Sequence, residues 1–459
     1  MKKKRLLVMV IVAILLISSI SPALAAKDDK VIYINVLLNT DITDEILAEL
    51  GDFGQVKGKV VKIDALTMKT KESALDDIRA LPFVAAANPD AERGTGPLDT
   101  VPVDNFADGL STWNLDVVNV TDFGFDNRQG GFDGTGVYVA VLDTGLVNNW
   151  RQYFPEQRIA TEYAKSFGGG GGEHGFVPEQ PNKWEKDTNS HGTHVTSTII
   201  GYSLDGTPVN GVAPMAKVIP VKVLNQNGSG WSSTIAEGIM YVASLKEGPL
   251  VDDPVVINMS LGGPALDAIE KTAIDYAINV GVIIVASAGN EGTAGMGYPG
   301  AYAPVISVAS SGWFGEWQPV GNGSWWWNLD VIEGFDANHY YISDFSSREL
   351  PGQDLDVAAP GSWVVGPYQL QMGKTSYYFL GGTSMASPHV AGIVALMAEK
   401  DSGLTAAKTE LILESAAIPF AAGCRIIGNP DGSTSEICWG DDATGHGLIT
   451  ADAALLAIP

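Results

Sequence analysis

The fold of this chain is restricted most by an alternation, from Gly134 onward, of short runs rich in Val and Ile with longer segments of helical periodicity. The apolar runs are Val137–Leu142, Val218–Leu224, Val255–Met259, Val282–Ala286 and Val305–Ala309. Helical periodicity lies near residues 191–201, 232–246, 264–280 and 383–400. Near-continuous apolar runs are typical of strands that are buried on both faces. We therefore predict an α/β fold, with a mainly parallel, doubly wound sheet that carries helices on both faces.

Residues 27–95 form a smaller unit of different character. Strands are predicted at Val31–Leu38, Val56–Ile63 and Phe83–Val84, and helices at Thr43–Leu50 and Glu72–Leu81. Residues 1–93 carry 13 basic and 13 acidic side chains, whereas residues 94–459 carry 15 basic and 40 acidic ones. The polar stretch Asn88–Pro102 has the composition of an interdomain linker. We expect a small α/β module at 27–95, followed by the main domain at 96–459.

The first 26 residues have the pattern of a signal peptide. Lys2 to Arg5 precede the 15-residue apolar run Leu6–Ile20, and Ala23-Leu24-Ala25 offers a cleavage site between small residues. A run of this length is short for a bilayer span. We expect residues 1–26 to direct export and to be removed, which gives a secreted protein without a membrane anchor. An uncleaved N-terminal anchor is the alternative.

The charge of the main domain excludes two classes of partner. The whole formal net charge of −25 belongs to residues 94–459. Binding to nucleic acid or to anionic lipid needs clustered cations, so neither partner is expected. Like charges also repel one another, and we expect a soluble monomer.

A serine nucleophile is indicated by residues 382–386, Gly-Thr-Ser-Met-Ala. Apolar residues follow at helical spacing, so Ser384 is expected at a helix N-terminus, where unpaired N–H groups favour negative charge. A serine hydroxyl needs a base and an orienting carboxylate before it can attack a carbonyl. Asp143 ends one apolar run, at the edge where α/β sheets carry their chemistry, although a lone Asp there would be read as a turn residue. His191 begins a helical segment that Ser190 is predicted to cap.

Together, residues 143–145 (Asp-Thr-Gly), 191–194 (His-Gly-Thr-His) and 382–386 resemble the three signature blocks of the subtilisin-like serine proteases. The order Asp, His, Ser is that of subtilisin and differs from the orders in α/β-hydrolases and chymotrypsin. The resemblance covers nearly all of residues 110–459. It implies a serine endopeptidase that cleaves protein and peptide substrates through Asp143, His191, Ser384 and an acyl-enzyme intermediate. It also implies that residues 27–95 are a propeptide that assists folding and inhibits the active site.

The same resemblance assigns the oxyanion donor and the substrate pocket. Asn290 follows a buried strand and would bind the oxyanion together with the backbone N–H of Ser384. Alone, an Asn after Gly would be read as a turn residue. Glycines in the pocket walls would let the substrate pair as an added strand. A glycine floor leaves room for a large apolar or aromatic residue before the scissile bond. The implied pocket residues are Ser260, Leu261, Gly262, Ser287, Ala288, Gly289 and Gly297.

The two histidines that lie near these blocks, His194 and His389, are not expected to bind a metal. A catalytic zinc site needs three protein ligands, and neither an HExxH motif nor a cysteine cluster is present. The chemistry needs no cofactor. A structural Ca²⁺ ion is common in the family and stays open here, because Asp205 is the only acid placed near the usual loop and an isolated Asp is more often a turn residue. No metal ligand is therefore assigned.

Two insertions and one cysteine pair complete the prediction. The insertions lie near 146–188, with a glycine run at 168–172, and near 312–341, with five tryptophans that form either a packed cluster or a binding platform. Cys424 and Cys438 are the only cysteines, and an even count in an exported chain predicts one disulfide. The alternative to a protease is a catalytically silent relative that binds proteins or glycans through the tryptophan-rich insertion.

Overall fold

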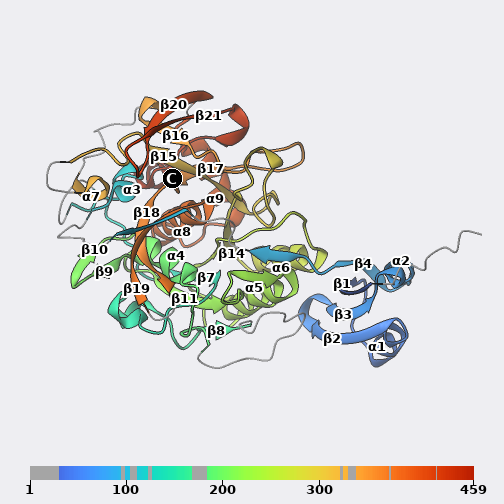
Figure 1. Ribbon diagram of the computed structural model, residues 1–459. Helices are drawn as coiled ribbons and strands as arrows, with labels where there is room; N and C mark the ends of the chain where they lie inside the picture. Colours follow the sequence, from blue (N-terminus) through green and yellow to red (C-terminus); the bar gives the residue numbers. More distant parts are fainter. Residues whose placement is uncertain are drawn as a thin grey trace, which may run out of the picture.

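The structure is a computed structural model that describes residues 30–94, 99–103, 111–121, 127–167, 183–320, 324–328, 337–371, 374–419 and 421–459. Its centre is an eight-stranded sheet in the order β16-β15-β14-β13-β7-β11-β8, with β17 also paired to β15 (Figure 1). All of these pairs are parallel except β15 with β16. The strands are β7 (Tyr138–Asp143), β8 (Lys165–Ser166), β11 (Lys217–Lys222), β13 (Val255–Met259), β14 (Val282–Ser287), β15 (Ile306–Trp313), β16 (Tyr340–Ile342) and β17 (Val357–Pro360).

Helices cover both faces of this sheet. Alternate residues of β7 enter two different cores: Val139 and Val141 join the core that contains α4 and α8, whereas Ala140 and Leu142 join the core that contains α5 and α6. Successive side chains of a strand point to opposite faces, so both faces of β7 are buried. The predicted doubly wound α/β fold is confirmed. The four helices are α4 (His191–Ile200), α5 (Ser232–Glu247), α6 (Ala268–Asn279) and α8 (Thr383–Lys400).

The N-terminal module has its own sheet, β2-β3-β1-β4, and its own apolar core. It lies beside α5 and α6 (Figure 1). The contact is partly polar, because Asp90 accepts hydrogen bonds from Ser232 and Ser233 at the start of α5 (3.1 Å each) and Asn35 donates to Asp267 before α6 (2.9 Å). It is also partly apolar, because Ile63 and Ala65 of the module join the core that contains α5 and α6. The elements are β1 (Val31–Leu38), α1 (Asp44–Gly51), β2 (Gly54–Val60), β3 (Ala65–Lys71), α2 (Leu75–Arg79) and β4 (Val84–Pro89).

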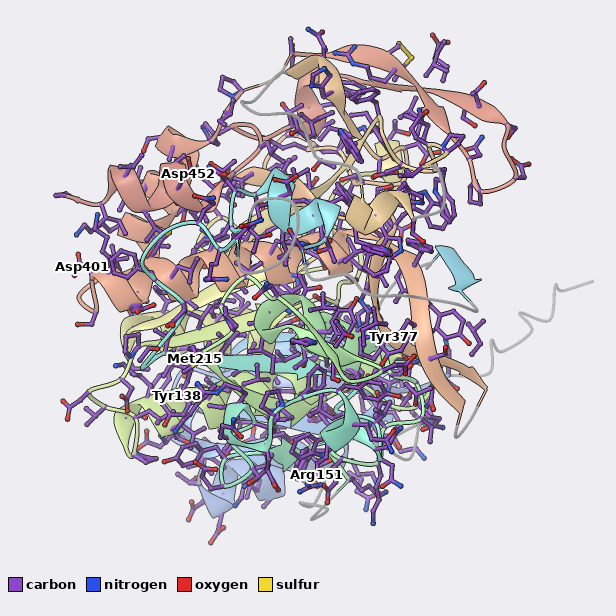
Figure 2. All side chains as sticks on the ribbon, turned by 90° about the vertical axis from the view of Figure 1, so that its left-hand side faces the viewer. Tyr138, Arg151, Met215, Tyr377, Asp401 and Asp452 are labelled. Atoms are coloured by element: carbon purple, nitrogen blue, oxygen red, sulfur yellow. A yellow bond between two sulfur atoms is a disulfide. The ribbon has the colours of Figure 1, made fainter. Side chains whose placement is uncertain are left out.

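Two short strands follow the module and pair with the main domain. β5 (Glu92–Gly94) is antiparallel to β12 (Ser229–Trp231), and β6 (Asp99–Val103) is antiparallel to β19 (Lys374–Gly381). β19 forms a hairpin with β18 (Val364–Gln371) and carries Tyr377, which is labelled in Figure 2. The linker predicted at Asn88–Pro102 is therefore largely strand.

The tryptophans of the insertion are packed against the core rather than exposed. Trp313, Trp325 and Trp326 are buried, and Trp317 and Trp327 are half-buried against the same core. For these tryptophans, the burial favours the interpretation as a packed cluster over the interpretation as a binding platform. The glycine run at 168–172 and the predicted signal peptide at 1–26 lie outside the described residues.

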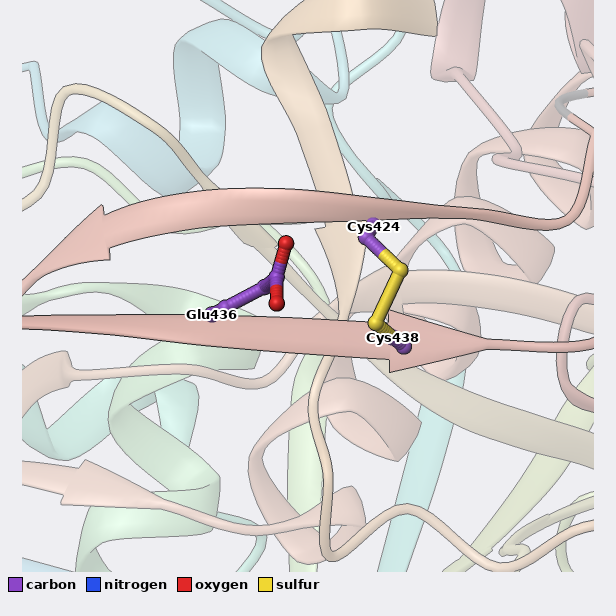
Figure 3. Close-up of side chains that lie close together, drawn as sticks. All are labelled: Cys424, Glu436 and Cys438. Carbon is purple, nitrogen blue, oxygen red and sulfur yellow. A yellow bond between two sulfur atoms is a disulfide. The ribbon is translucent and has the colours of Figure 1, made fainter.

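A disulfide joins Cys424 to Cys438 across an antiparallel hairpin, as predicted (Figure 3). The carboxylate of Glu436 lies close to the pair, but the two sulfur atoms are bonded to each other and offer no thiolate to a metal. This hairpin and the other remaining elements are α3 (Trp113–Val117), β9 (Tyr202–Leu204), β10 (Thr207–Val209), α7 (Trp325–Asn328), α9 (Ala406–Ala416), β20 (Gly423–Gly428), β21 (Thr434–Trp439) and α10 (Ala451–Ala457). Among the residues that the structure describes, no helix has both the length and the apolar character needed to cross a membrane.

Candidate active site

The end of β7 and the start of α4 bring Asp143 and His191 together. His191 Nδ1 lies 2.9 Å from each carboxylate oxygen of Asp143, and both side chains are fully buried. Thr144 N–H also donates to Asp143 Oδ1 (2.6 Å). The geometry holds the imidazole with Nδ1 as the donor, so Nε2 remains as the basic atom. Nε2 is buried and has no hydrogen-bond partner among the described residues.

The close approach of α4 to β7 requires the glycine that follows His191. A Cβ atom at Gly192 would lie 2.5 Å from the Gly145 carbonyl oxygen and 3.2 Å from Asp143 Cβ. Both distances are shorter than an unstrained contact, and the first involves rigid backbone. Glycine therefore sets how near the His191 helix can come to the strand that ends at Asp143.

The turn before His191 is held by Asp187, a residue that sequence reasoning missed. Its carboxylate accepts hydrogen bonds from Thr144 Oγ1, Asn189 N–H and Ser190 N–H at 2.7 to 2.9 Å. Burial raises the pKa of Asp187 to about 6, although the Lys222 charge and these hydrogen bonds oppose the rise. In the sequence, Asp187 was indicated only by its position as an acid four residues before His191, within the insertion predicted near 146–188.

The prediction that Ser190 caps α4 with its side chain is wrong. Ser190 precedes the helix but has φ of 76°, and its Oγ donates to the Asn189 carbonyl instead of accepting from the first turn. The Asn189 side chain accepts from His191 N–H at 3.2 Å. The left-handed backbone turns the Ser190 hydroxyl away, where it accepts from Gln369 N–H of β18 (2.9 Å).

Ser384 is the second residue of α8, as predicted for a nucleophile at a helix N-terminus. Its Oγ donates to the Ser260 carbonyl (3.2 Å), and Ser260 Oγ donates to the Ser384 carbonyl (2.8 Å). Asn258 donates to Ser260 Oγ (3.0 Å). These buried bonds fix Ser384 against the end of β13, and α8 packs on the His191 helix, α4.

Asn290 follows β14 and faces the start of α8. Its Oδ1 accepts from Thr383 N–H (2.8 Å) and from Thr383 Oγ1 (2.9 Å). Since the oxygen is held in this way, the Nδ2 amide is the end of the side chain left for a ligand. Asn290 also lines the pocket described next, so this donor borders the substrate space.

A cavity of about 940 Å³ lies beside these residues. Of the seven predicted pocket residues, Ser260 and Ala288 are buried behind the surface, and five line it: Leu261, Gly262, Ser287, Gly289 and Gly297. The wall at 260–262 is joined to the floor at Gly297 by Gly263 and Tyr298, which exchange backbone hydrogen bonds of 2.8 and 2.9 Å. Sequence reasoning missed Met296, Leu350 and Gln353, which also line the cavity. Ala91, which precedes β5, lines the cavity as well.

His194 and His389 are both buried, and one ring nitrogen of each lies within hydrogen-bond distance of a backbone carbonyl. His194 Nε2 bonds to the Val364 carbonyl (3.1 Å), and burial lowers its pKa to about 3. His389 bonds to the Met385 carbonyl and to Asn114 (2.8 Å each), and burial lowers its pKa to about 4. Both imidazoles are therefore neutral at physiological pH.

One group of acidic residues in the described part of the chain has the donors that a hard cation prefers. Oxygens of Asp354, Asp356 and Glu410 lie within 4.8 Å of one another. Asp356 is buried, and its Oδ1 has no hydrogen-bond partner. Burial is the main cause that raises the pKa of Asp356 to about 8 and that of Glu410 to about 7. Three carboxylates with one unsatisfied oxygen fit Ca²⁺. Asp205 is a turn residue with φ of 47° between β9 and β10.

An Asp–His pair at the end of a parallel strand, with a serine at the start of a facing helix, defines a class of serine hydrolase. The chain belongs to the Subtilase family (Peptidase S8), whose profile matches residues 134–448. Its enzyme class is that of the subtilisin-type serine proteases, which need no cofactor for catalysis.

Several known proteins resemble this chain over most of its length. It is 30% identical to the thermostable alkaline protease of Halalkalibacterium halodurans over 395 residues, which are 86% of this chain and 88% of that protein. It is 34% identical to subtilisin E of Bacillus subtilis over 291 residues, which are 62% of each protein. Among solved structures it resembles fervidolysin of Fervidobacterium pennivorans, described as a keratinolytic enzyme related to subtilisin. That match has a TM-score of 0.66 and 25% identity, and covers 94% of this chain and 62% of fervidolysin.

Proposed function

We propose that this chain is a secreted serine endopeptidase of broad specificity that cleaves peptide bonds through Asp143, His191 and Ser384. The observation that carries the proposal is the buried pair of His191 Nδ1 and Asp143 at 2.9 Å, next to the helix that begins at Ser384. Both side chains are shielded from water, so the interaction between them is stronger than it would be at the surface. The positive charge that His191 carries during the reaction would be stabilised mainly by Asp143. The pair therefore favours proton transfer to Nε2.

In the proposed reaction, His191 Nε2 takes the Ser384 proton while Oγ attacks the substrate carbonyl carbon. Asp143 keeps the imidazole in the required tautomer and stabilises the imidazolium. The oxyanion would accept from Asn290 Nδ2 and from the Ser384 N–H. The imidazolium then gives its proton to the leaving amine, and an acyl-enzyme remains on Ser384. Water repeats the sequence with His191 as its base and releases the acid.

The direct test is hydrolysis of casein by the purified protein, with and without a serine-directed inhibitor such as a sulfonyl fluoride. We expect cleavage that the inhibitor abolishes, with one equivalent of inhibitor bound at Ser384. Size-exclusion chromatography in the same preparation tests the expected monomer. Complete absence of cleavage by well-folded protein that was produced with residues 27–95 and then freed of them would overturn the proposal.

Preference for a large apolar or aromatic residue before the scissile bond is proposed from the cavity. Its lining is mostly glycine and apolar side chains. A Cβ at Gly297 would lie 3.5 to 3.8 Å from Gly262 and Gly263, so a side chain fits there but takes up space between the walls. We expect Gly297→Val to shift preference from Phe and Leu toward Ala by about 1 to 3 kcal/mol in relative kcat/KM. A peptide library measures the shift, with Gly131→Ala as control, because Gly131 does not line the cavity and has open space for a Cβ. An unchanged profile would place the pocket elsewhere.

Residues 1–26 are proposed as a signal peptide and residues 27–95 as an inhibitory propeptide. Support for inhibition comes from the cavity and its neighbouring strand, since Ala91 lines the cavity and its carbonyl accepts from Ser232 N–H at 3.0 Å. β5 then pairs with β12, as an extended substrate would. A segment bound in this way blocks the site until it is cut and released.

Maturation by self-cleavage follows from this proposal. In a protease-free host, wild type is expected to lose its N-terminal module by cleavage between Gly94 and Asp99, and Ser384→Ala is expected to keep it. Mass spectrometry of the secreted protein identifies its N-terminal and C-terminal residues and so shows where the chain was cut. Normal processing of Ser384→Ala would show that another protease performs the cut, whereas the triad assignment would stand.

A structural Ca²⁺ ion is proposed at Asp354, Asp356 and Glu410. Bound Ca²⁺ would offset the repulsion of the three carboxylates and tie α9 to the segment before β17. In the Ser384→Ala background, which prevents self-digestion, 5 mM Ca²⁺ is expected to raise Tm relative to EDTA, by roughly 2–4 °C for each kcal/mol of binding. Glu410→Gln should remove most of that rise, and the exposed control Glu436→Gln should not. Equal responses of the two variants would exclude the site.

The alternative of a silent binding protein finds no support in the tryptophan-rich insertion. A platform for proteins or glycans needs exposed ring faces. The described tryptophans of this segment are buried or half-buried and pack on one another and on Phe379. The acidic surface gives no reason to expect nucleic acid as a partner.

A further inference from the structure

The tryptophan-rich insertion contains a fully buried carboxylate, that of Glu316. Its Oε1 accepts a hydrogen bond from Trp313 N–H (3.0 Å), and its Oε2 accepts from the hydroxyls of Tyr341 (2.7 Å) and Ser362 (2.9 Å). In the described part of the chain, these three partners are neutral groups. Glu316 therefore ties the start of the insertion to β16 and to the segment that follows β17.

Stability alone gives no reason for an acid at this position. Burial raises the pKa of Glu316 to about 7, and its hydrogen bonds to Trp313, Tyr341 and Ser362 oppose that rise. A carboxylate is costly to bury without a cation beside it. Natural chains keep groups of this kind mainly where function needs them. The contacts of Ser362 show which functional element Glu316 holds.

Ser362 directly follows a glycine that touches the turn before the nucleophile helix. The Gly361 carbonyl accepts from the N–H of Gly382 (2.8 Å), which lies two residues before Ser384. A Cβ atom at Gly361 would lie 2.5 Å from Ser310 Oγ and 2.8 Å from the Gly382 carbonyl oxygen. Both values are below van der Waals contact, so only glycine allows this approach. A shift of Ser362 is thus passed on to the backbone that leads into α8.

The same segment contacts the helix that carries the base. The Val364 carbonyl, at the start of β18, lies 3.1 Å from Nε2 of His194, which is in the first turn of α4 together with His191. Residues 361–364 therefore connect the N-terminal ends of α4 and α8. Glu316 fixes these residues through Ser362.

From these contacts we propose that Glu316 is a positioning residue for Ser384 and acts through Ser362 and residues 361–364. This inference rests on the proposed endopeptidase function. Ser384 Oγ has to lie within reach of both His191 Nε2 and the substrate carbonyl, and a displacement of about 1 Å can lower the rate by about 10²-fold. Neither Glu316 nor Ser362 lines the cavity. Loss of their contact should therefore lower kcat and leave KM largely unchanged.

The test compares two serine-to-alanine variants of the mature, well-folded enzyme on one peptide amide. Ser362→Ala removes a hydroxyl that donates to Glu316, whereas Ser311→Ala removes a buried hydroxyl on β15 that has no hydrogen-bond partner among the described residues. We expect Ser362→Ala to lower kcat by about 10- to 100-fold with KM within about 2-fold of wild type. Ser311→Ala should change neither constant. Ser362→Thr keeps the hydroxyl and should recover most of kcat.

Glu316→Gln tests the carboxylate itself. The amide has nearly the same shape but only one acceptor oxygen, so either Trp313 N–H or the two hydroxyls lose their acceptor. We expect kcat to fall as in Ser362→Ala, and the double variant to lose little more, because both changes break the same contact. The rate constant for inactivation by a sulfonyl fluoride should fall by the same factor, since that reaction needs Ser384 and His191 but no peptide contacts.

The outcomes separate this inference from the function it rests on. A kcat for Ser362→Ala as high as that for Ser311→Ala would overturn the positioning role and leave the protease function intact. A loss that comes with a lower Tm and disappears in assays at lower temperature would also overturn it, because a merely destabilised enzyme behaves in this way. Fully additive losses in the double variant would show that Glu316 does not act through Ser362. Absence of hydrolysis by wild type would overturn the proposed function itself.

Discussion

Replacement of Ser384 or His191 by alanine is expected to lower kcat for peptide hydrolysis by about 10⁶, which leaves no measurable proteolysis of casein. Losses of this size follow single removal of the serine or the histidine in subtilisin, which is the reference case for this chemistry. The physical reason is that nucleophile and base act as one unit: without Nε2 the hydroxyl keeps its proton, and without Oγ the base has nothing to activate. Initial rates on casein and on one short peptide measure the effect.

Two substitutions serve as matched controls. Ser244 lies on α5 and bonds only within its own helix, to the Tyr241 carbonyl (2.6 Å), among the contacts described. His446 has a half-exposed imidazole near Glu414 (3.6 Å). Ser244→Ala and His446→Ala are expected to keep nearly full activity. More than about 1% of wild-type kcat in well-folded Ser384→Ala or His191→Ala would be incompatible with the assigned roles, given the expected loss of about 10⁶.

Loss of the Asn290 amide is expected to lower kcat by about 10² to 10³ with little change in KM, because the oxyanion forms only after substrate has bound. Asn290→Ala alone would not isolate this effect, since Thr383 also loses the acceptor for its N–H and hydroxyl. Asn290→Asp keeps an oxygen acceptor for Thr383 and removes the N–H donor. We expect Asp to be at least as damaging as Ala, because its charge also repels the oxyanion.

Steady-state kinetics on a peptide ester and on the matching amide would measure both variants. Circular dichroism and the thermal midpoint check that each remains folded. If Asn290→Asp kept kcat within 10-fold of wild type, the amide would be a structural partner of Thr383, and the oxyanion would have to be stabilised by backbone donors alone.

The central sheet was predictable because its signal is local. Strands buried on both faces leave unbroken runs of Val and Ile, and the runs near 137, 255 and 282 lie within a residue or two of β7, β13 and β14. The hairpins β18–β19 and β20–β21 were missed, since their pairing depends on partners and surroundings that the local composition does not encode. β19 in particular lies between β18 and β6, from opposite parts of the chain.

The main residues of the candidate site could be predicted from the sequence, but the contacts that hold them in place could not. Asp143, His191 and Ser384 stand in short segments whose neighbours are glycine and small residues, a pattern visible without a structure. Asp187 has no such pattern, because its importance comes from three donors that converge on one buried carboxylate. Ser190 was misjudged for a related reason, since capping preference assumes a backbone conformation that a left-handed residue does not have. The cavity lining by Gln353 likewise depends on a loop that is distant in sequence.

The glycine after His191 also limits how this protein can be stabilised. Exchange of a helical glycine for alanine is a general way to gain up to about 1 kcal/mol, because it reduces the freedom of the unfolded chain. At Gly192 the added methyl group would meet the Gly145 carbonyl oxygen at 2.5 Å and would push α4 away from β7. A directed-evolution library for heat resistance would therefore keep glycine at position 192. Because the Asp143–His191 pair requires glycine at position 192, the denatured chain keeps more conformational freedom there than alanine would allow.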